Sequence, residues 1–211
     1  MQRQLLPARG FTLIELLVVV TIIMILAGLM LSVFRYANVK AATDRARAEI
    51  SALSLALEAY KIDNGDYPRA TDSTDTLDAS KNGDAHVSPS GDTPYMLASL
   101  VLYKALSGDA NLDGRLTAAG DYSSGEKPRV YFEFKSSLLN PRIPQGGTRA
   151  ANSINGVLDP FRNVYGYSTL GTASSGTAGY NPTFDLWSTA DYESNKTGCD
   201  NVTQQTWIKN W

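Results

Sequence analysis

The residues best suited to chemistry in this 211-residue sequence are aspartates, and one group of them has the spacing of a calcium-binding loop. The stretch GDANLDGRLTAAGD matches the D-x-N-x-D-G opening of such a loop, and calcium prefers about six to eight oxygen ligands. A glycine stands at the twelfth position, where a carboxylate normally closes the site, and an aspartate follows one residue later. Two interpretations therefore stay open, a calcium loop and an Asx-rich turn without metal. The candidate ligands are Asp109, Asn111, Asp113 and Asp121.

Composition leaves little room for histidine or cysteine chemistry. The sequence has one cysteine, Cys199, and one histidine, His86. A single cysteine permits no internal disulfide and no cysteine-based zinc cluster, and a single histidine permits no multi-histidine metal site. The net charge of −2 provides no basic excess for nucleic acid. We therefore expect neither an enzyme nor a nucleic-acid partner.

One carboxylate, Glu15, lies inside a strongly apolar run. Residues 11–34 contain no other charged side chain and are long enough to span a bilayer as a helix. A charge inside a membrane costs about 2.5–3.5 kcal/mol on insertion scales, so we expect Glu15 to have a function. Arg3 and Arg9 precede the run and favour a cytoplasmic location for that end of the chain.

The sequence GFTLIELLVVV, which begins at Gly10, resembles the cleavage motif of type IV prepilins and type II secretion pseudopilins. The resemblance implies that prepilin peptidase removes residues 1–10 as a leader and methylates the new N-terminus at Phe11. It also implies that Glu15 pairs, in a filament, with the Phe11 amine of a neighbouring subunit. A buried pair of this kind is favourable only when both partners meet, so it would select the correct register.

A helical pattern continues through residues 35–62 and ends at the sequence DNGDYP. The side chains expected on its buried face are Ile50, Leu53, Leu57 and Tyr60. The pilin resemblance implies an α+β fold, in which one long helix packs on a head with a small antiparallel sheet. Residues 11–34 would lie in the membrane or filament core, and residues 63–211 would form the head.

Patterns within the head predict one further helix and three strands. The polar stretch 69–92 is expected to be an exposed loop, and the helix is expected to start near Thr93. Alternating or aromatic-rich segments predict strands in RVYFEFKSSLL, residues 129–139, around residues 164–168, and in YNPTFDLWST, residues 180–189.

Three segments resemble the major pseudopilin of type II secretion: YKIDNGDYP, DPFRNVYGYS and FDLWSTAD. In the second, Arg162 stands where the family has glycine, and residues 70–150 depart from the family as a variable insert. The resemblance also implies a calcium site in the C-terminal loop, built from aspartates and backbone carbonyls. Its candidate ligands here are Ser188, Asp191, Asp200 and Asn201. The alternative is a loop ordered by hydrogen bonds and tryptophan packing alone.

The resemblance implies a structural subunit of a type IV pilus-like or type II secretion filament. Its implied partners are further copies of itself, prepilin peptidase, an inner-membrane assembly platform and minor pseudopilins. Its implied location is the inner membrane, with a single span and a periplasmic head, and then the extracytoplasmic filament. Two alternatives stay open: a minor pilin that adheres or captures DNA, for which Arg142 and Arg149 are the basic candidates, and a membrane-anchored enzyme, for which no catalytic constellation is found.

Overall fold

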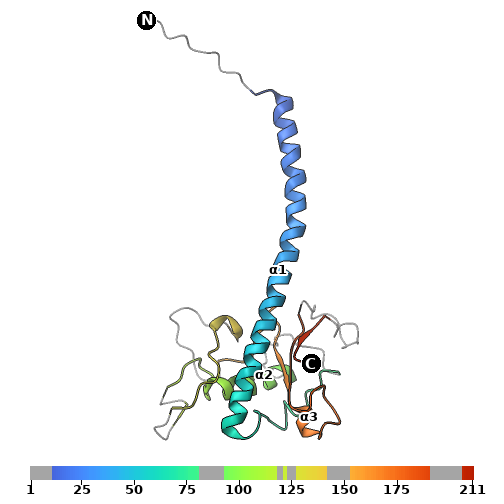
Figure 1. The fold of residues 1–211 in the computed structure, drawn as a ribbon. Helices are drawn as coiled ribbons and strands as arrows, with labels where there is room; N and C mark the ends of the chain where they lie inside the picture. Colours follow the sequence, from blue (N-terminus) through green and yellow to red (C-terminus); the bar gives the residue numbers. More distant parts are fainter. Residues whose placement is uncertain (1–10, 81–92, 118–120, 123–126, 142–152, 191–205) are drawn as a thin grey trace. The chain divides into compact units, whose positions relative to one another are not determined.

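The computed structural model describes residues 11–80, 93–117, 121–122, 127–141, 153–190 and 206–211, with only the backbone described at residues 31–33. By their contacts the residues form two units, Met1–Ala41 and Ala42–Trp211. The architecture is α+β, with a long N-terminal helix and small antiparallel sheets, as the sequence predicts (Figure 1).

The long helix, α1, runs from Leu13 to Asn64. It contains no proline, and it ends where Gly65 adopts a φ of 86° and donates its N–H to the Lys61 carbonyl at 2.7 Å. A residue without a Cβ adopts this left-handed conformation without steric cost, so the Asn-Gly pair in the sequence marks the helix end correctly.

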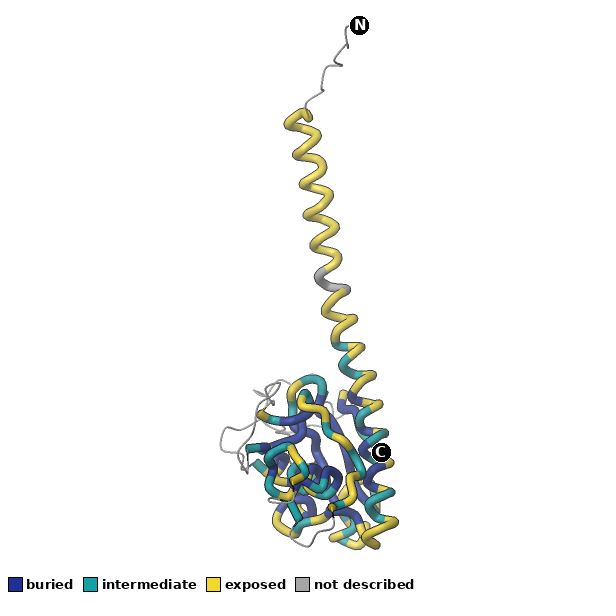
Figure 2. Tube along the Cα trace, turned by 90° about the vertical axis from the view of Figure 1, so that its left-hand side faces the viewer, coloured by how far each residue is buried: buried dark blue, intermediate teal, exposed yellow. Residues whose placement is uncertain are grey.

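The part of α1 that belongs to the first unit exposes every described side chain as far as Met30 (Figure 2). Its side chains are almost all apolar, and the helix is long and apolar enough to cross a membrane. Exposed apolar surface of this extent is unfavourable in water, which indicates a lipid or protein environment for the segment.

In the second unit, α1 contributes one apolar face to the core. Ile50, Leu53 and Leu57 are buried in a cluster that includes residues from α2 and the sheets, and Tyr60 packs against it, as predicted. Helix α2 runs from Pro94 to Ser107 and is capped by Thr93, whose hydroxyl accepts the Met96 N–H at 3.3 Å.

Two short antiparallel sheets complete the head. Strand β1, Leu139–Asn140, pairs with β2, Gly156–Val157. The second sheet has the order β3-β4-β5, with β3 at Gly166–Ser168, β4 at Asp185–Ser188 and β5 at Ile208–Lys209. The predictions around residues 164–168 and 180–189 are therefore confirmed for β3 and β4, whereas β5 was not predicted.

The predicted strand over residues 129–139 is wrong for most of its length, because only Leu139 belongs to a strand there. The alternation has another cause: Phe132 and Phe134 pack against the core from a segment without regular structure. The backbone N–H groups of Tyr131 and Phe132 both donate to the carbonyl of Leu106, at the end of α2, instead of to a neighbouring strand.

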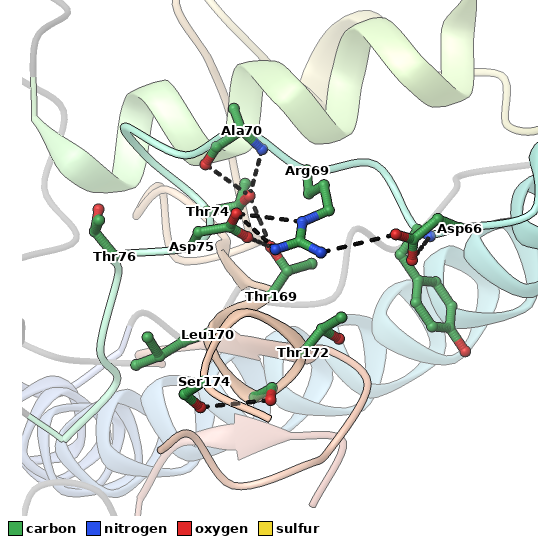
Figure 3. A network of polar contacts seen from close by, with 12 residues as sticks. Asp66, Arg69, Ala70, Thr74, Asp75, Thr76, Thr169, Leu170, Thr172 and Ser174 are labelled. Carbon is green, nitrogen blue, oxygen red and sulfur yellow. Dashed lines mark hydrogen bonds and ion pairs between the residues drawn. The ribbon is translucent and has the colours of Figure 1, made fainter. Parts of the chain in front are cut away.

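A polar network fastens the chain that follows α1 to the end of β3 (Figure 3). Arg69 donates to Asp75 Oδ2 at 2.9 Å, and the Thr169 hydroxyl donates to Asp75 Oδ1 at 2.6 Å. The Thr169 N–H also donates to the Thr74 carbonyl at 2.8 Å. Thr74 and Asp75 are buried, so this part of the polar stretch is not the exposed loop that its composition predicts.

Candidate assembly segment and calcium loops

The start of α1 places Glu15 in a reciprocal contact with Thr12. The Thr12 N–H and hydroxyl donate to Glu15 Oε2 at 2.8 and 2.7 Å, and the Glu15 N–H donates back to Thr12 Oγ1 at 3.3 Å. This is a capping box, which satisfies N–H groups that have no partner within a first helical turn. The carboxylate that the sequence singles out therefore already has hydrogen-bond donors in the single chain.

Phe11 precedes this turn and is 84% exposed, and Gly10 lies outside the described residues. The cleavage and methylation assigned to these two residues stay predictions. Thr12 is the residue that sequence analysis missed: the spacing Thr-x-x-Glu at a helix start is a capping-box signature and could have identified it.

The central loop brings its four predicted ligands together around backbone N–H groups. Asp109 is buried, and its carboxylate accepts the N–H of Gly114 at 2.7 Å and the Tyr103 hydroxyl at 2.7 Å. Asp113 accepts from Asn111 Nδ2 at 3.1 Å. Gly114 adopts a φ of 80°, which closes the turn around the Asp109 carboxylate.

Asp121, the residue one position late for a calcium loop, folds back onto the same turn. Its Oδ1 accepts the N–H groups of Ala110 and Asn111 at 3.0 and 3.2 Å, and its Oδ2 accepts that of Thr117 at 2.7 Å. Each of these carboxylates thus accepts hydrogen bonds from donors within or next to the loop. The described residues contain no group of three or more His, Cys, Asp or Glu placed to hold a metal. This geometry fits the Asx-rich turn, and calcium binding here stays a prediction.

Of the C-terminal candidates, only Ser188 lies within the described residues; Asp191, Asp200 and Asn201 lie outside them. The Ser188 hydroxyl donates to Asp159 Oδ2 at 2.5 Å. Asn163 Nδ2 donates to the Ala190 carbonyl at 2.8 Å, so the turn that contains Asp159 holds the end of β4.

Asp159 is a buried carboxylate at the centre of that turn. Its Oδ1 accepts the N–H groups of Phe161 and Asn163 at 2.9 and 2.8 Å. Burial raises the pKa of Asp159 to about 7, against the opposing effect of these hydrogen bonds. Within the turn, Arg162 has a φ of 75°, a conformation that favours the glycine that the resemblance to pseudopilins implies at this position.

The beginning of the chain matches known families. Residues 7–31 match the prokaryotic N-terminal methylation motif, and residues 33–102 match the type II secretion system protein G family. An apolar helix with this motif, continuing into a small α+β head, is similar to the type IV pilin-like proteins. Within that class, the two matches make this chain similar to a major pseudopilin of type II secretion systems.

Several individual proteins that are similar to this chain are described as type II secretion system core protein G. Type II secretion system core protein G of Escherichia coli K12 is 41% identical over 69 residues, which are 33% of this chain and 48% of that protein. The protein of that name from Klebsiella pneumoniae is 35% identical over 86 residues, 41% of this chain and 59% of its own. The one from Pseudomonas aeruginosa is 40% identical over 68 residues, 32% of this chain and 48% of its own. The chain thus spans about half the length of these relatives, and no solved structure matches it significantly.

Proposed function

We propose that this protein is a filament-forming subunit of a type II secretion pseudopilus or a closely similar type IV pilus-like fibre. The observation that carries the proposal is Glu15, a carboxylate in the first turn of an apolar helix that starts within an N-terminal methylation motif. The relatives found for this chain are described as core protein G of that secretion system.

The mechanism begins with maturation. Prepilin peptidase cuts after Gly10 and methylates the amine of Phe11, which gives the helix a positive charge at its start. In the membrane, the Thr12 donors reduce the cost of the buried Glu15 carboxylate. In the fibre, the Phe11 amine of a neighbour takes over as the partner of Glu15, and the exposed apolar side chains of α1 exchange lipid for neighbouring helices.

The partners and location follow from this mechanism. An inner-membrane assembly platform extracts each subunit and adds it to the base of the fibre, and minor pseudopilins join the same fibre. Arg3 and Arg9 hold the N-terminal end in the cytoplasm before cleavage, which directs the head to the periplasm.

The proposal is tested by replacing Glu15 in the full chain, expressed with a complete assembly system. Glu15→Ala and Glu15→Gln are expected to leave membrane insertion and cleavage intact and to abolish sedimentable fibres, because neither side chain can form an ion pair with the amine. Glu133→Ala, which removes an exposed carboxylate of the head, is the matched control and is expected to assemble normally. Mass spectrometry of the mature chain identifies the N-terminus.

Two results would contradict the proposal. One is an N-terminus other than methylated Phe11, which would remove the pilin-like maturation. The other is an unchanged fibre yield for both Glu15 variants, which would remove the pairing that the mechanism requires.

Calcium binding in the head is a separate proposal. We propose that the C-terminal loop, which includes Asp191, is the better candidate, because the carboxylates of the central loop already accept donors within the loop. Beside Ser188, the buried Thr189 Oγ1 has no hydrogen-bond partner among the described residues. A buried oxygen without a partner is a feature that an ion or a water molecule would satisfy.

A further inference from the structure

A groove of about 800 Å³ lies between α1 and β5 within the second unit. Its apolar part comes from Ile50 and from Leu55, which is 73% exposed. The groove is lined by, among others, Arg47, Ile50, Ser54 and Leu55 of α1, and by Trp207 and Lys209 near the end of the chain. We refer to this feature as the α1–β5 groove.

Two residues of the α1–β5 groove contain buried polar atoms without a hydrogen-bond partner in the described part of the chain, Ser54 Oγ and Trp207 Nε1. A buried donor left without a partner costs about 1–3 kcal/mol. The N–H of Asn210 donates to the Leu186 carbonyl at 3.1 Å. Because hydrogen-bonded and non-hydrogen-bonded residue pairs alternate along an antiparallel ladder, the backbone N–H and C=O groups of Lys209 point away from β4. These features indicate a surface that binds a partner with polar as well as apolar groups.

The rim of the groove carries two cationic side chains, Arg47 and Lys209, and one carboxylate, Glu58. The Arg47 side chain is 61% exposed and forms one ion pair with a described residue, Asp44, at 3.3 Å. The Lys209 ammonium lies 4.9 Å from the centre of the Trp211 ring, a contact that leaves it available to a carboxylate. The acidic residue at the groove, Glu58, accepts the Tyr67 hydroxyl at 2.9 Å. An apolar floor with two cations at its rim therefore fits an apolar side chain that has a carboxylate nearby.

This chain carries such a feature on its own surface, at the end of α1. Ile62 is 83% exposed, and the Asp66 side chain is 56% exposed, with Arg69 as a distant partner at 3.8 Å. We refer to residues 62–66 as the α1 tip. Because Leu55 and Ile62 belong to the same rigid helix, the tip cannot enter the groove of its own chain.

We propose that the α1–β5 groove of one subunit receives the α1 tip of a second copy. Ile62 would pack on Ile50 and Leu55, and Asp66 would pair with Lys209. The contact joins two different surfaces of identical chains, so it is heterologous and propagates as an open helical fibre. The inference rests on the proposed fibre and names the head contact that fixes its geometry.

The first test is a cysteine pair in assembled fibres of the full chain. In a Cys199→Ser background, Leu55→Cys together with Ile62→Cys is expected to give a ladder of disulfide-linked oligomers on mild oxidation. Each single variant is the matched control and is expected to stay monomeric on the gel. Fibres without a ladder would overturn the proposal, as would dimers from Leu55→Cys alone or a link from Leu55→Cys to a different protein.

The second test uses charge reversal. Lys209→Glu is expected to lower the yield of fibres at least about tenfold, because it places like charges together at the contact. Asp66→Lys in the same chain is expected to restore the yield, whereas Lys135→Glu, an exposed reversal elsewhere, is expected to have no effect. Lack of rescue in a folded double variant would overturn the proposal.

The two tests also separate this inference from the proposed function. If the unmodified chain forms no fibre, the proposed function fails. If fibres form normally but neither the cysteine pair nor the charge reversal reports the contact, only the groove–tip contact is overturned.

Discussion

Replacing Arg162 with glycine should stabilise the head. Arg162 is exposed and has a φ of 75° in the turn that Asp159 organises, and its N–H donates to the Asp159 carbonyl at 3.0 Å. A left-handed conformation costs a residue with a Cβ about 1–2 kcal/mol, and glycine avoids this cost. The greater chain entropy of glycine in the unfolded state takes back about 0.5–1 kcal/mol. We therefore expect Arg162→Gly to raise the free energy of unfolding by about 0.5–1 kcal/mol.

Arg162→Ala is the control that isolates the backbone effect, because it removes the same side chain but keeps the Cβ. Denaturant unfolding of residues 42–211 compares the three chains. The glycine variant should exceed the alanine variant by about 1 kcal/mol, which corresponds to about 2–4 °C in Tm for a domain of this size. Equal stability of the two variants, or a glycine variant less stable than the parent, would show that the turn is not strained at Arg162.

Three further predictions concern the head. Gly166→Ala should destabilise it by about 3 kcal/mol, because the new Cβ would lie 2.1 Å from Trp187 Cε2; a loss below 1 kcal/mol in denaturant unfolding would contradict the close packing. Because the pKa of Asp159 is raised, the folded state binds a proton between about pH 4 and pH 7 that the unfolded state does not bind. The free energy of unfolding should therefore rise as the pH falls from about 7 to about 4. Asp159→Asn should make this rise smaller. Calcium at millimolar concentration should raise the Tm of the head by mass action. Asp191→Ala should abolish that gain and Asp113→Ala should leave it; the reverse pattern would assign the site to the central loop, and no shift in the parent would remove both sites.

Sequence patterns predicted those elements whose signals are local. The capping threonine and the proline of α2 lie next to each other in the chain. The Asn-Gly pair at the end of α1 supplies Gly65, which adopts the positive φ that ends the helix. The apolar face of α1 follows helical spacing, so the burial of Leu53 and Leu57 could be predicted without knowledge of the tertiary structure.

The errors arose where distant residues determine the outcome. The polar stretch after Pro68 is partly buried because Thr169, almost a hundred residues later, provides partners for Thr74 and Asp75. The segment 129–135 alternates like a strand, but the carbonyl of Leu106 takes its N–H groups. Hydrogen bonds between distant segments leave no periodic signal in the sequence.

The structure also changes how the role of Glu15 is understood. From the sequence, this carboxylate is a liability in the membrane that only a neighbouring amine can relieve. In the single chain, however, Thr12 already provides two hydrogen bonds to it. In the proposed fibre, the amine of a neighbour must therefore stabilise Glu15 more than these hydrogen bonds do, which requires that water is excluded and that the positive charge lies within contact distance. On this proposal, the hydrogen bonds from Thr12 stabilise Glu15 in the unassembled subunit, and the ion pair adds a preference for the assembled state. A subunit in the wrong register would lose the bonds to Thr12 without gaining the ion pair.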